Sequence, residues 1–407
     1  MNGWLRVFEG LGRAKDPHSV AVADLREAAR RRLPRAVFDF IDGGADDEVA
    51  LRQNRAAFDD VRFRQRVLVG TTTRDQSVEL FGRRWSAPFA IGPTGLAGLA
   101  RPGAEIALAR AAAAAGVPFT LSSFACATIE AVAACCAGPK WFQLYIFRDR
   151  GLSRELLGRA FAAGYEALVV TADCPVGGKR ERDPRNHFSI PMRVTPRNAA
   201  DVLRRPAWLL DALRAGPPLP VNLLGSVDRH ADTRSLEQLA GELLDSSVTW
   251  DDVAEVRRAW PKTLIVKGVL AAEDVRRAAA IGADGVVVSN HGGRQLDTAL
   301  TPLTVLPELA EIANGHLALL CDSGFRRGGD VVKAFALGAN GVLLGRATLY
   351  GVAAAGESGA SRALAIVGDE VDRTLALLGC RSIHDVSSDH VALPSSWKAR
   401  NQSGGTD

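Results

Sequence analysis

Residues 317–346 read LALLCDSGFRRGGDVVKAFALGANGVLLGR and contain a complete strand–helix–strand unit. The apolar run 317–321 ends in polar residues, and a Gly-rich turn leads through an Ala-rich stretch to a second apolar run, 341–344. Continuous apolar runs are typical of strands that are buried on both faces of a parallel sheet. A helix between two such strands supplies the crossover that parallel pairing needs. This stretch therefore predicts an α/β fold with a parallel sheet.

The same unit repeats from about residue 87 onward. The predicted strands are 88–93, 117–122, 140–145, 167–173, 264–268, 285–290, 317–322 and 341–345. Eight strands that alternate with helices close naturally into a TIM (β/α)8 barrel. A doubly wound open sheet is the competing fold, but its usual G-x-G-x-x-G after the first strand is absent. We therefore predict a barrel over residues 87–390.

Three segments lie outside this repeat. Residues 1–86 are expected to form an N-terminal helical cap, since 20–33 is amphipathic. Residues 174–250 separate the fourth and fifth strands by far more than a crossover needs, which indicates a lid or a binding element. Residues 391–407 are mostly polar and are expected to be a flexible tail.

Composition narrows the class of protein. Of the 407 residues, 47% are hydrophobic and 24% are charged, which is ordinary for a globular protein. The charged N-terminus does not resemble a signal peptide and no run of 18 apolar residues occurs, so we expect a cytoplasmic protein. A net charge of +4 without a recognisable motif gives no reason to expect nucleic acid as a partner.

Six cysteines are present, without a C-x-x-C pair or the His/Cys spacing of a zinc site. They are Cys126, Cys135, Cys136, Cys174, Cys321 and Cys380. We expect them to be reduced and mostly buried, and we expect no bound metal. Cys174 alone lies beside a sequence that we interpret as catalytic.

The polar residues at the strand ends are the candidates for chemistry, because barrel enzymes react at the carboxyl ends of their strands. They are Thr94, Ser122, Gln143, Tyr145, Thr171, Asp173, Lys267, Ser289, His291, Arg294, Asp322, Arg326, Gly345 and Arg346. After the last two strands, CDSGFRRGGD and LLGRA place Gly-rich backbone and arginine before a helix, which favours a phosphate site. Tight turns with surface arginines are the alternative, but both segments occur where barrels bind phosphate.

The segment 289–297, SNHGGRQLD, follows the sixth strand. His291 can accept a proton near neutral pH, and Arg294 can hold a carboxylate through two hydrogen bonds. Asp173 at the end of the fourth strand could orient the imidazole, as in a catalytic triad. A structural histidine is the alternative, but its position between polar residues and glycines at the barrel mouth favours a functional one.

Lys267 ends the fifth strand, and a buried lysine is costly unless it meets a partner. One such partner is an electron-accepting ring that becomes anionic. A Schiff-base lysine in an aldolase or isomerase is the alternative chemistry. Tyr145 and Arg180 add donors that suit a small anion.

These segments resemble the FMN-dependent L-2-hydroxy-acid oxidising enzymes. The resemblance extends from RLPRAVFDFIDGGADDE (32–48) to about residue 390, and SNHGGRQLD and DSGFRRGGDVVKAFALG are its most specific parts. GPTGLAG, WFQLY, KRERDPRNHFSIPM and LLGRATLYG are most similar to the mandelate-oxidising members. The resemblance implies FMN as cofactor and oxidation of a 2-hydroxy acid to the 2-oxo acid. It implies a quinone or another carrier as electron acceptor, with an oxygen-using oxidase that makes hydrogen peroxide as the alternative.

The resemblance also implies residue roles. His291 is the expected base, paired with Asp173, and Arg180 and Arg294 are expected to bind the substrate carboxylate. Tyr145 is expected to contact the substrate. The residues expected to hold the flavin ring and ribityl chain are Pro93, Thr94, Gly95, Ser122, Gln143, Thr171, Lys267 and Ser289. Those expected to hold the ribityl and phosphate are Asp322, Gly324, Arg326, Gly345 and Arg346.

Two substrate-side positions bear on specificity. The family usually has Tyr where this chain has Phe40, and the lost hydroxyl would bind the substrate carboxylate with about 1.5–3 kcal/mol, or roughly 10- to 150-fold. Either the protein binds the substrate carboxylate more weakly, or its substrate is bulkier and packs on Phe40. A bulkier substrate could be an aromatic, mandelate-like acid, a modified acid or a peptide-linked one. A flavin-binding scaffold without catalysis is a third alternative, but His291 and its partners are retained. Gly95 stands where family members that are poor oxidases tend to have Gly, which favours a dehydrogenase.

The insertion bears on location. Residues 184–227 contain six arginines and two aspartates among Trp- and Leu-rich segments, which suits an interfacial segment on an anionic membrane. A lid packed on its own barrel or on a neighbouring subunit is the alternative. With the resemblance, this favours a homotetramer that is peripheral on the inner face of the cell membrane.

Overall fold

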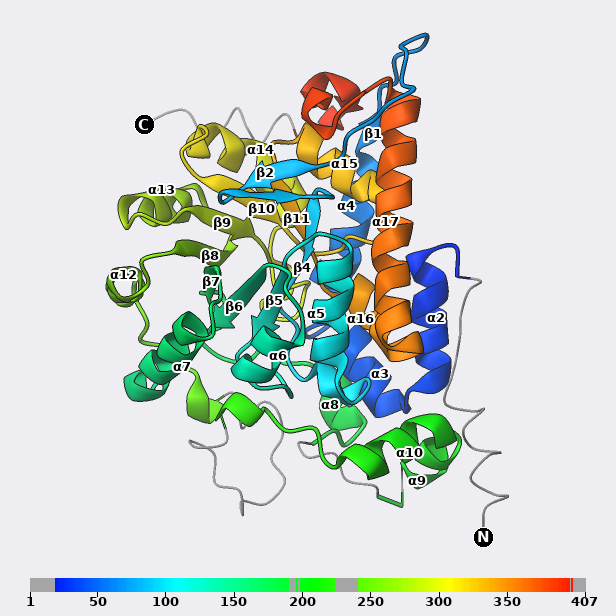
Figure 1. The fold of residues 1–407 in the computed structure, drawn as a ribbon, viewed down its shortest axis with the longest axis vertical. Coiled ribbons are helices and arrows are strands. Elements are labelled where there is room, and N and C mark those ends of the chain that lie inside the picture. Colours follow the sequence, from blue (N-terminus) through cyan, green and yellow to red (C-terminus); the bar gives the residue numbers. More distant parts are fainter. Residues whose placement is uncertain (1–18, 190–194, 197, 224–240, 396, 398–407) are drawn as a thin grey trace.

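The computed structural model describes residues 19–189, 195–196, 198–223, 241–395 and 397. Its centre is the predicted TIM barrel, in which eight parallel strands close on themselves (Figure 1). They are β4 (Phe89–Ile91), β5 (Phe119–Ser122), β6 (Lys140–Leu144), β7 (Ala167–Thr171), β8 (Thr263–Val269), β9 (Gly285–Val288), β10 (Ala318–Cys321) and β11 (Gly341–Leu344). Each lies within or overlaps one of the eight apolar runs, so the sequence prediction of the barrel is confirmed.

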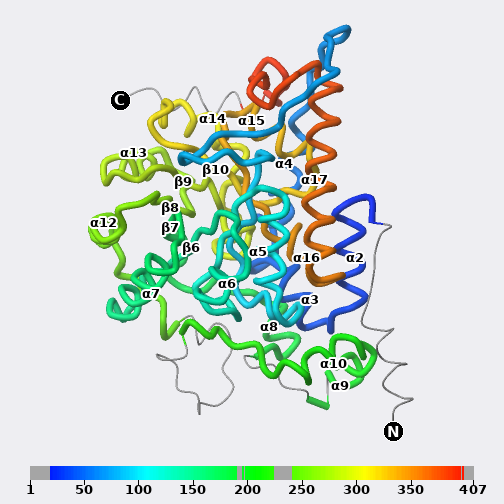
Figure 2. The backbone as a smooth tube through the Cα atoms, viewed as in Figure 1, coloured from blue at the N-terminus to red at the C-terminus, as the bar shows by residue number. Residues whose placement is uncertain are grey.

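The strands follow one another around the barrel in chain order, and β11 closes it by pairing with β4, with Val342 opposite Phe89. Nearly every strand residue is buried, which explains why these runs show no polar alternation. The outer ring of helices consists of α5 (Ala104–Ala114), α6 (Ile129–Cys135), α7 (Arg150–Ala162), α12 (Trp250–Ala259), α13 (Ala272–Ala280), α14 (Pro302–Ala313), α15 (Gly328–Ala336) and α16 (Arg346–Ala355). Figure 2 shows the backbone colour advancing around the ring.

The N-terminal segment is helical only in its first part. It contains α2 (Val22–Arg32), α3 (Arg35–Asp42) and α4 (Val49–Asp60). The buried stripe Val22, Leu25 and Ala29 on α2 has helical spacing, and α2 packs against α16 and the long α17 (Glu357–Leu378).

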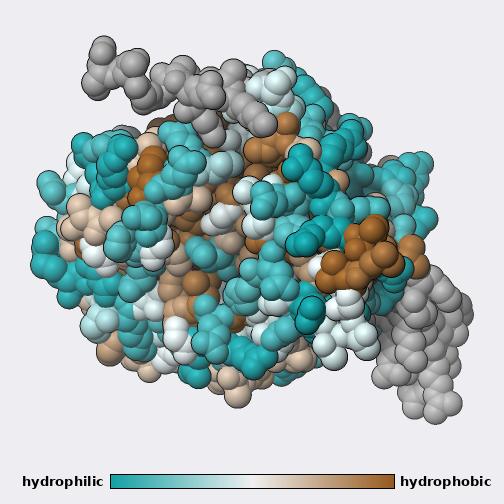
Figure 3. Space-filling view, turned by 90° about the horizontal axis from the view of Figure 1, so that it is seen from above, coloured by the Kyte–Doolittle hydropathy of each residue, from teal (hydrophilic) through white to brown (hydrophobic). Residues whose placement is uncertain are grey.

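The expected helical cap over 1–86 is therefore incomplete, because strands follow α4. These are β1 (Arg62–Phe63), β2 (Val78–Leu80) and β3 (Arg83–Trp85). The β2–β3 hairpin packs Trp85 against Trp141 at the start of β6, with ring centroids 5.4 Å apart. This hairpin covers the amino-terminal end of the barrel and leaves the carboxyl end as the open one. Seen from above the view of Figure 1, the surface is mainly hydrophilic (Figure 3).

The insertion between β7 and β8 forms helices on the side of the molecule opposite to the β2–β3 hairpin (Figure 1). They are α8 (Arg182–Arg185), α9 (Ala199–Leu203) and α10 (Pro206–Ala215), followed by the 3-10 turn η2 (Val221–Leu223). Trp208 on α10 is buried and donates from its indole nitrogen to the Leu99 carbonyl at 2.9 Å. One face of α10 is thus anchored on the barrel. Residues 190–194, 197 and 224–240 of the insertion lie outside the described residues.

The C-terminal boundary differs from the expected one. The strand β12 (Val391–Ala392) pairs antiparallel with β1, and Val391 is buried opposite Phe63. The flexible tail assigned to 391–407 was therefore placed too early, because an apolar residue at its start completes a small sheet. Among the described residues, no helix combines the length and the apolar character needed to cross a bilayer.

Candidate active site

A cavity opens at the carboxyl ends of the strands. Its volume is about 1300 Å³, including the solvent-filled space at its open mouth. Most of the predicted site residues line it: Phe40, Pro93, Thr94, Gly95, Ser122, Gln143, Tyr145, Thr171, Arg180, Lys267, His291, Arg294, Asp322, Gly324, Arg326, Gly345 and Arg346. The other two, Asp173 and Ser289, lie directly behind the wall and hydrogen-bond to residues that line it. The structure therefore brings together side chains that the sequence placed only at separate strand ends.

The loop after β9 presents His291 from an unusual backbone conformation. His291 has φ +57°, in the left-handed region that non-glycine residues rarely adopt, and Gly292 and Gly293 continue it with φ +67° and +72°. A Cβ on Gly293 would approach the Leu51 backbone nitrogen to 2.6 Å, so a side chain has no space there. The His291 amide donates to the Ser289 hydroxyl at 3.0 Å, which helps to hold the turn. Backbone strain of this kind is concentrated at functional sites.

His291 is paired with Asp173, as predicted. Its Nδ1 lies 3.0 Å from Asp173 Oδ1. Burial lowers the pKa of His291 below its ordinary value, although the neighbouring carboxylate of Asp173 opposes the shift. The imidazole is therefore neutral at physiological pH, with Nδ1–H donated to Asp173 and Nε2 available to accept a proton. This is the arrangement of a general base with an orienting carboxylate.

Lys267 already has protein partners. Its Nζ lies 3.0 Å from Asp322 Oδ2 and 2.7 Å from the Ser289 hydroxyl. Burial would lower the pKa of Lys267, but the carboxylates of Asp322 and Asp173 outweigh burial and raise it above its ordinary value. A Schiff base needs a neutral amine, so this environment disfavours the aldolase-like alternative. A protonated lysine in the cavity wall suits an anionic or electron-rich ligand.

The cavity concentrates positive charge. Arg294 donates to the carbonyls of Phe40 and Gly43, at 2.7 and 3.0 Å. Burial lowers the pKa of Arg294, and the neighbouring guanidinium groups of Arg180 and Arg346 lower it further. The Arg180 Nε atom is buried without a hydrogen-bond partner. Buried charges that lack partners are costly, so this end of the cavity favours an anion.

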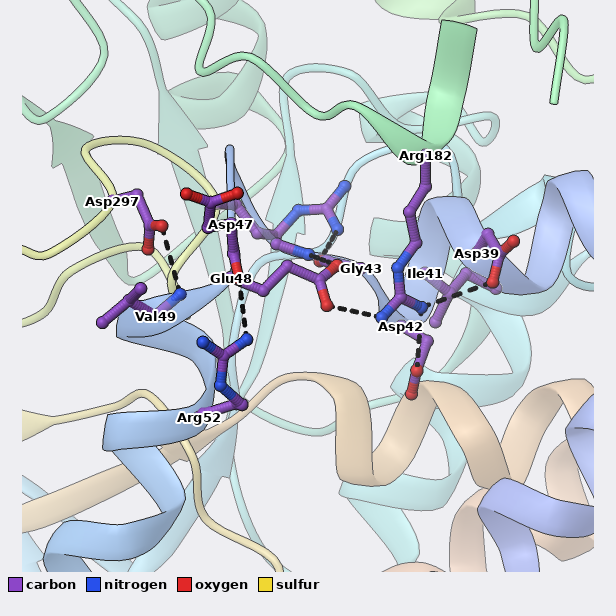
Figure 4. Close-up of polar contacts among 12 residues, drawn as sticks. Asp39, Ile41, Asp42, Gly43, Asp47, Glu48, Val49, Arg52, Arg182 and Asp297 are labelled. Carbon is purple, nitrogen blue, oxygen red and sulfur yellow. Dashed lines mark hydrogen bonds and ion pairs between the residues drawn. The ribbon is translucent and has the colours of Figure 1, made fainter. Parts of the chain in front are cut away.

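The carbonyls that hold Arg294 belong to the last turn of α3 and to Gly43, the residue directly after it. A network of charges holds this end of the helix in place (Figure 4). Arg182 on α8 reaches Asp39 and Asp42 at 3.3 and 3.4 Å, and Glu48 at 2.5 Å. Burial would raise the pKa of Asp42, but hydrogen bonds from Arg26 and Tyr350 outweigh it and lower the pKa to about 2. Arg182 therefore ties the insertion to the N-terminal cap beside the cavity.

A second concentration of positive charge lies after β10 and β11. Arg346 donates to the carbonyls of Ile41, Gly43 and Gly292, at 2.9, 2.7 and 2.9 Å. Burial lowers its pKa to about 10, and the nearby Arg326 adds to the shift. Arg326 itself contacts the Phe325 carbonyl at 2.8 Å and lies over the Tyr350 ring. Both arginines line the cavity beside Gly345, at the start of α16.

Between these regions the wall carries polar atoms that lack partners. Gln143 Nε2 and Thr171 Oγ1 are buried and make no hydrogen bond. The other amide atom, Gln143 Oε1, accepts from the Ser122 hydroxyl at 3.0 Å. Buried polar groups are almost always paired, so these atoms indicate a ligand with polar edges.

Several residues of the site were not predicted from the sequence. Phe124, Cys174, Leu244, Gln295 and Ser323 also line the cavity. Phe124, Gln295 and Ser323 lie within two residues of predicted ones, so a wider search at each strand end would have found them. Leu244 comes from the insertion, and no motif marks it.

The cysteines are reduced, as expected, but they are less buried than expected. Only Cys321 and Cys380 are fully buried, and the other four are partly exposed. Cys174 is the one that lines the cavity. It lies there because it follows Asp173 directly at the end of β7.

Comparison with known proteins agrees with this site. The profile of the FMN-dependent dehydrogenase family matches residues 29–393. The chain is 45% identical to (S)-mandelate dehydrogenase of Pseudomonas putida, over 91% of this chain and 93% of that protein. It is 44% identical to L-lactate dehydrogenase of Caulobacter vibrioides, over 91% of this chain and 97% of that protein.

A solved structure of the monotopic membrane protein (S)-mandelate dehydrogenase superposes with a TM-score of 0.88 at 43% identity, covering 93% of this chain and all of that one. The resemblance inferred from the sequence motifs and the FMN cofactor that it implied are confirmed. The protein belongs to the FMN-dependent dehydrogenase family.

Proposed function

We propose that this protein oxidises an L-2-hydroxy acid to the 2-oxo acid, with His291 as the base. The observation that carries the proposal is the meeting of three features in one cavity. These are a neutral imidazole held by Asp173, the paired guanidinium groups of Arg180 and Arg294, and the unpartnered Arg180 Nε. A 2-hydroxy acid needs both a base for its proton and cations for its carboxylate.

The residues present fit FMN. The unpartnered Gln143 Nε2 and Thr171 Oγ1 match the polar edge of an isoalloxazine ring, with Ser122 and Lys267 beside them. Backbone at Pro93, Thr94 and Gly95 and the hydroxyl of Ser289 would support the ring from neighbouring strands. Arg326 and Arg346, with Gly324, Gly345 and Asp322, would hold the ribityl phosphate. FMN, when bound, takes up the two electrons that the substrate loses.

The protein side chains supply binding and proton transfer. Arg180 and Arg294 would bind the substrate carboxylate and orient its α-carbon. Burial raises the pKa of Tyr145 well above its ordinary value, so its phenol stays protonated and can donate to a substrate oxygen. His291 would accept a proton at Nε2 as the substrate is oxidised, and the carboxylate of Asp173 would stabilise the imidazolium.

We propose an aromatic substrate side chain. Phe40 stacks on Phe188 with ring centroids 4.8 Å apart and an interplanar angle of 12°. Phe40, Phe124 and Leu244 give the cavity an apolar wall beside the two arginines. Phe40 lacks the hydroxyl that the family usually places here, so the site offers packing where relatives offer a hydrogen bond. A mandelate-like acid would fill this wall better than lactate would.

The test is anaerobic mixing of the purified flavoprotein with (S)-mandelate and, separately, with L-lactate, following bleaching of the flavin absorbance. We expect fast bleaching with mandelate and much slower bleaching with lactate. Equal rates would contradict the aromatic preference but keep the oxidation. A yellow protein that neither acid bleaches would contradict this substrate class, and peptide-linked or modified hydroxy acids would then be tested.

We propose a quinone or another carrier, and not oxygen, as the electron acceptor. The support is Gly95, the residue type that poor oxidases of the family tend to have at this position. A Cβ there would lie 3.1 Å from Phe124 Cβ, so an alanine would crowd the cavity wall. Oxygen consumption during turnover, compared with reduction of a soluble quinone, tests this proposal. Stoichiometric hydrogen peroxide would instead identify an oxidase.

We further propose that the insertion contacts the inner face of the cell membrane. Leu203 and Leu213 are 67% and 71% exposed, and exposed arginines, Arg204 and Arg214, follow them directly. Apolar side chains beside cations suit an anionic bilayer surface. Sedimentation with anionic vesicles tests this, with Leu203→Asp/Leu213→Asp as the variant. Vesicle binding that the variant retains would contradict the proposal.

We also propose that the protein is a homotetramer, which light scattering would detect.

A further inference from the structure

Cys174 forms a compact cluster with the proposed catalytic pair. Its Sγ lies 3.5 Å from His291 Nδ1 and 3.4 Å from Asp173 Oδ1, and these two atoms are 3.0 Å apart. Together they are the group of three metal-ligating side chains that the described part of the chain brings within 4.8 Å of one another. No spacing in the sequence indicates this cluster, because His291 is separated from the other two residues by more than a hundred positions.

We propose that Asp173, Cys174 and His291 form a binding site for Zn²⁺ or a similarly thiophilic cation, and that the bound ion blocks the base. The three ligand atoms form a triangle whose corners lie about 1.9 Å from a common centre. Zinc bonds to sulfur, nitrogen and oxygen are about 2.0–2.3 Å long, so an ion slightly out of this plane reaches all three without rearrangement.

The chemistry of the ligands supports the geometry. Thiolate, imidazole and carboxylate are the three side-chain ligands that zinc prefers, and three protein ligands with an open fourth position are a stable arrangement. Asp173 Oδ2 is buried with no hydrogen-bond partner, so a second carboxylate oxygen is available to the ion. Burial raises the pKa of the Cys174 thiol, so the ion would have to displace its proton to solvent on binding. The thiolate and carboxylate charges would then offset the cation, whereas the nearby cations Lys267 and Arg180 oppose it.

The consequence for catalysis depends on the proposed role of His291, whereas binding does not. An imidazole that binds a metal through Nδ1 carries its only proton on Nε2. It can then neither accept a second proton at Nε2 nor donate to Asp173. A cation at this site would therefore stop flavin reduction without competing for the carboxylate-binding arginines, and a chelator would restore it.

The experiment uses the flavin-loaded protein and measures binding and reduction separately. After dialysis against buffered Zn²⁺, bound zinc per chain is measured by atomic absorption, and Cd²⁺ is used to detect thiolate ligation by its ultraviolet absorption. The rate of flavin reduction is measured with the best hydroxy acid, before and after chelation. We expect one zinc per chain and a chelator-reversible loss of at least tenfold in rate.

Two variants locate the ion. Cys174→Ala should lose the bound zinc and the Cd²⁺ absorption. Its rate of flavin reduction, measured relative to its own zinc-free rate, should be at least tenfold less sensitive to Zn²⁺ than that of the wild type. The control is Cys135→Ala/Cys136→Ala, because those sulfur atoms are 3.5 Å apart and could bind zinc themselves. Loss of zinc in the control but not in Cys174→Ala would overturn the site, as would equal inhibition by Mg²⁺. Zinc bound through Cys174 with unchanged reduction would overturn the block on the base.

Discussion

The two ends of the cavity are built from different parts of the chain. At one end, the turns directly after β10 and β11 supply Arg326 and Arg346, so the barrel strands themselves position these groups. At the other end, Phe40 comes from the N-terminal cap and Arg180 from the insertion. Arg182 joins those two segments through three carboxylates. Barrel proteins can therefore keep one end constant for a cofactor while the other varies with the substrate.

Because different segments build the two ends, a substitution at one end should affect the substrate or the cofactor without affecting the other. His291 lines the same cavity and should affect the reaction itself. His291→Asn should keep the flavin bound but slow its reduction by up to about 10⁴-fold, because no base remains to accept the proton. Stopped-flow absorbance after anaerobic mixing with substrate measures the rate. The control is Cys321→Ala, because Cys321 is a buried thiol that does not line the cavity. An unchanged reduction rate in His291→Asn would remove its assigned role.

Removing a charge at the substrate end should affect substrate and spare the cofactor. Arg180→Met keeps the apolar stem and loses the guanidinium, which should cost about 2–5 kcal/mol in kcat/KM, up to several thousand-fold. Flavin content, measured from the visible spectrum of the purified protein, should match that of the wild type. A variant that loses its flavin would show that the two ends are not independent.

The reciprocal substitution is Arg326→Met at the other end. Loss of a charge-assisted hydrogen bond to phosphate should weaken FMN binding by about 1.5–3 kcal/mol, or roughly 10- to 150-fold. The measurement is the quenching of FMN fluorescence as apoprotein is added to a fixed concentration of FMN. When the variant is saturated with FMN, its KM for substrate should stay near the wild-type value. A large rise in KM at saturation would contradict the separation.

The features that the sequence could predict and those that it could not are divided in the same way, between the barrel strands and the segments that cover their ends. The strands of the barrel and the residues at their ends were predictable, because buried parallel strands have continuous apolar runs and a barrel brings all their carboxyl ends together. The stacking of Phe188 on Phe40 was not, because no period or spacing relates the insertion to the cap. The hairpin β2–β3 was missed because each strand has only three residues.

The pH dependence tests the state of His291. Since burial lowers its pKa, the free protein should hold a neutral base at pH 7, and kcat/KM should be flat there. As the pH falls through the lowered pKa, the imidazole is protonated and kcat/KM should fall about tenfold per unit. The break should lie below the ordinary histidine value of about 6.5. In Asp173→Asn it should move lower still, because the carboxylate raises the pKa of His291. A break above 6.5 would mean that the carboxylate of Asp173 outweighs burial and raises the pKa of His291.

The smallest expected effect is at Phe40, where cap and insertion meet. Phe40→Tyr adds the hydroxyl that the family usually has, and a hydrogen bond to a carboxylate is worth about 1.5–3 kcal/mol. The added hydroxyl would also disturb the stacking on Phe188, which would reduce this gain in binding free energy by about 0.5–1.5 kcal/mol. From the middle of these two ranges, the net gain in kcat/KM should be about tenfold. It should be larger for L-lactate than for (S)-mandelate, because the smaller acid depends more on its carboxylate. Phe188→Leu is the control, since it loosens the stack without adding a donor and should lower kcat/KM for mandelate most. If Phe40→Tyr improved both acids equally, the aromatic wall would not select the substrate, and the variable end of the cavity would act only as a carboxylate clamp.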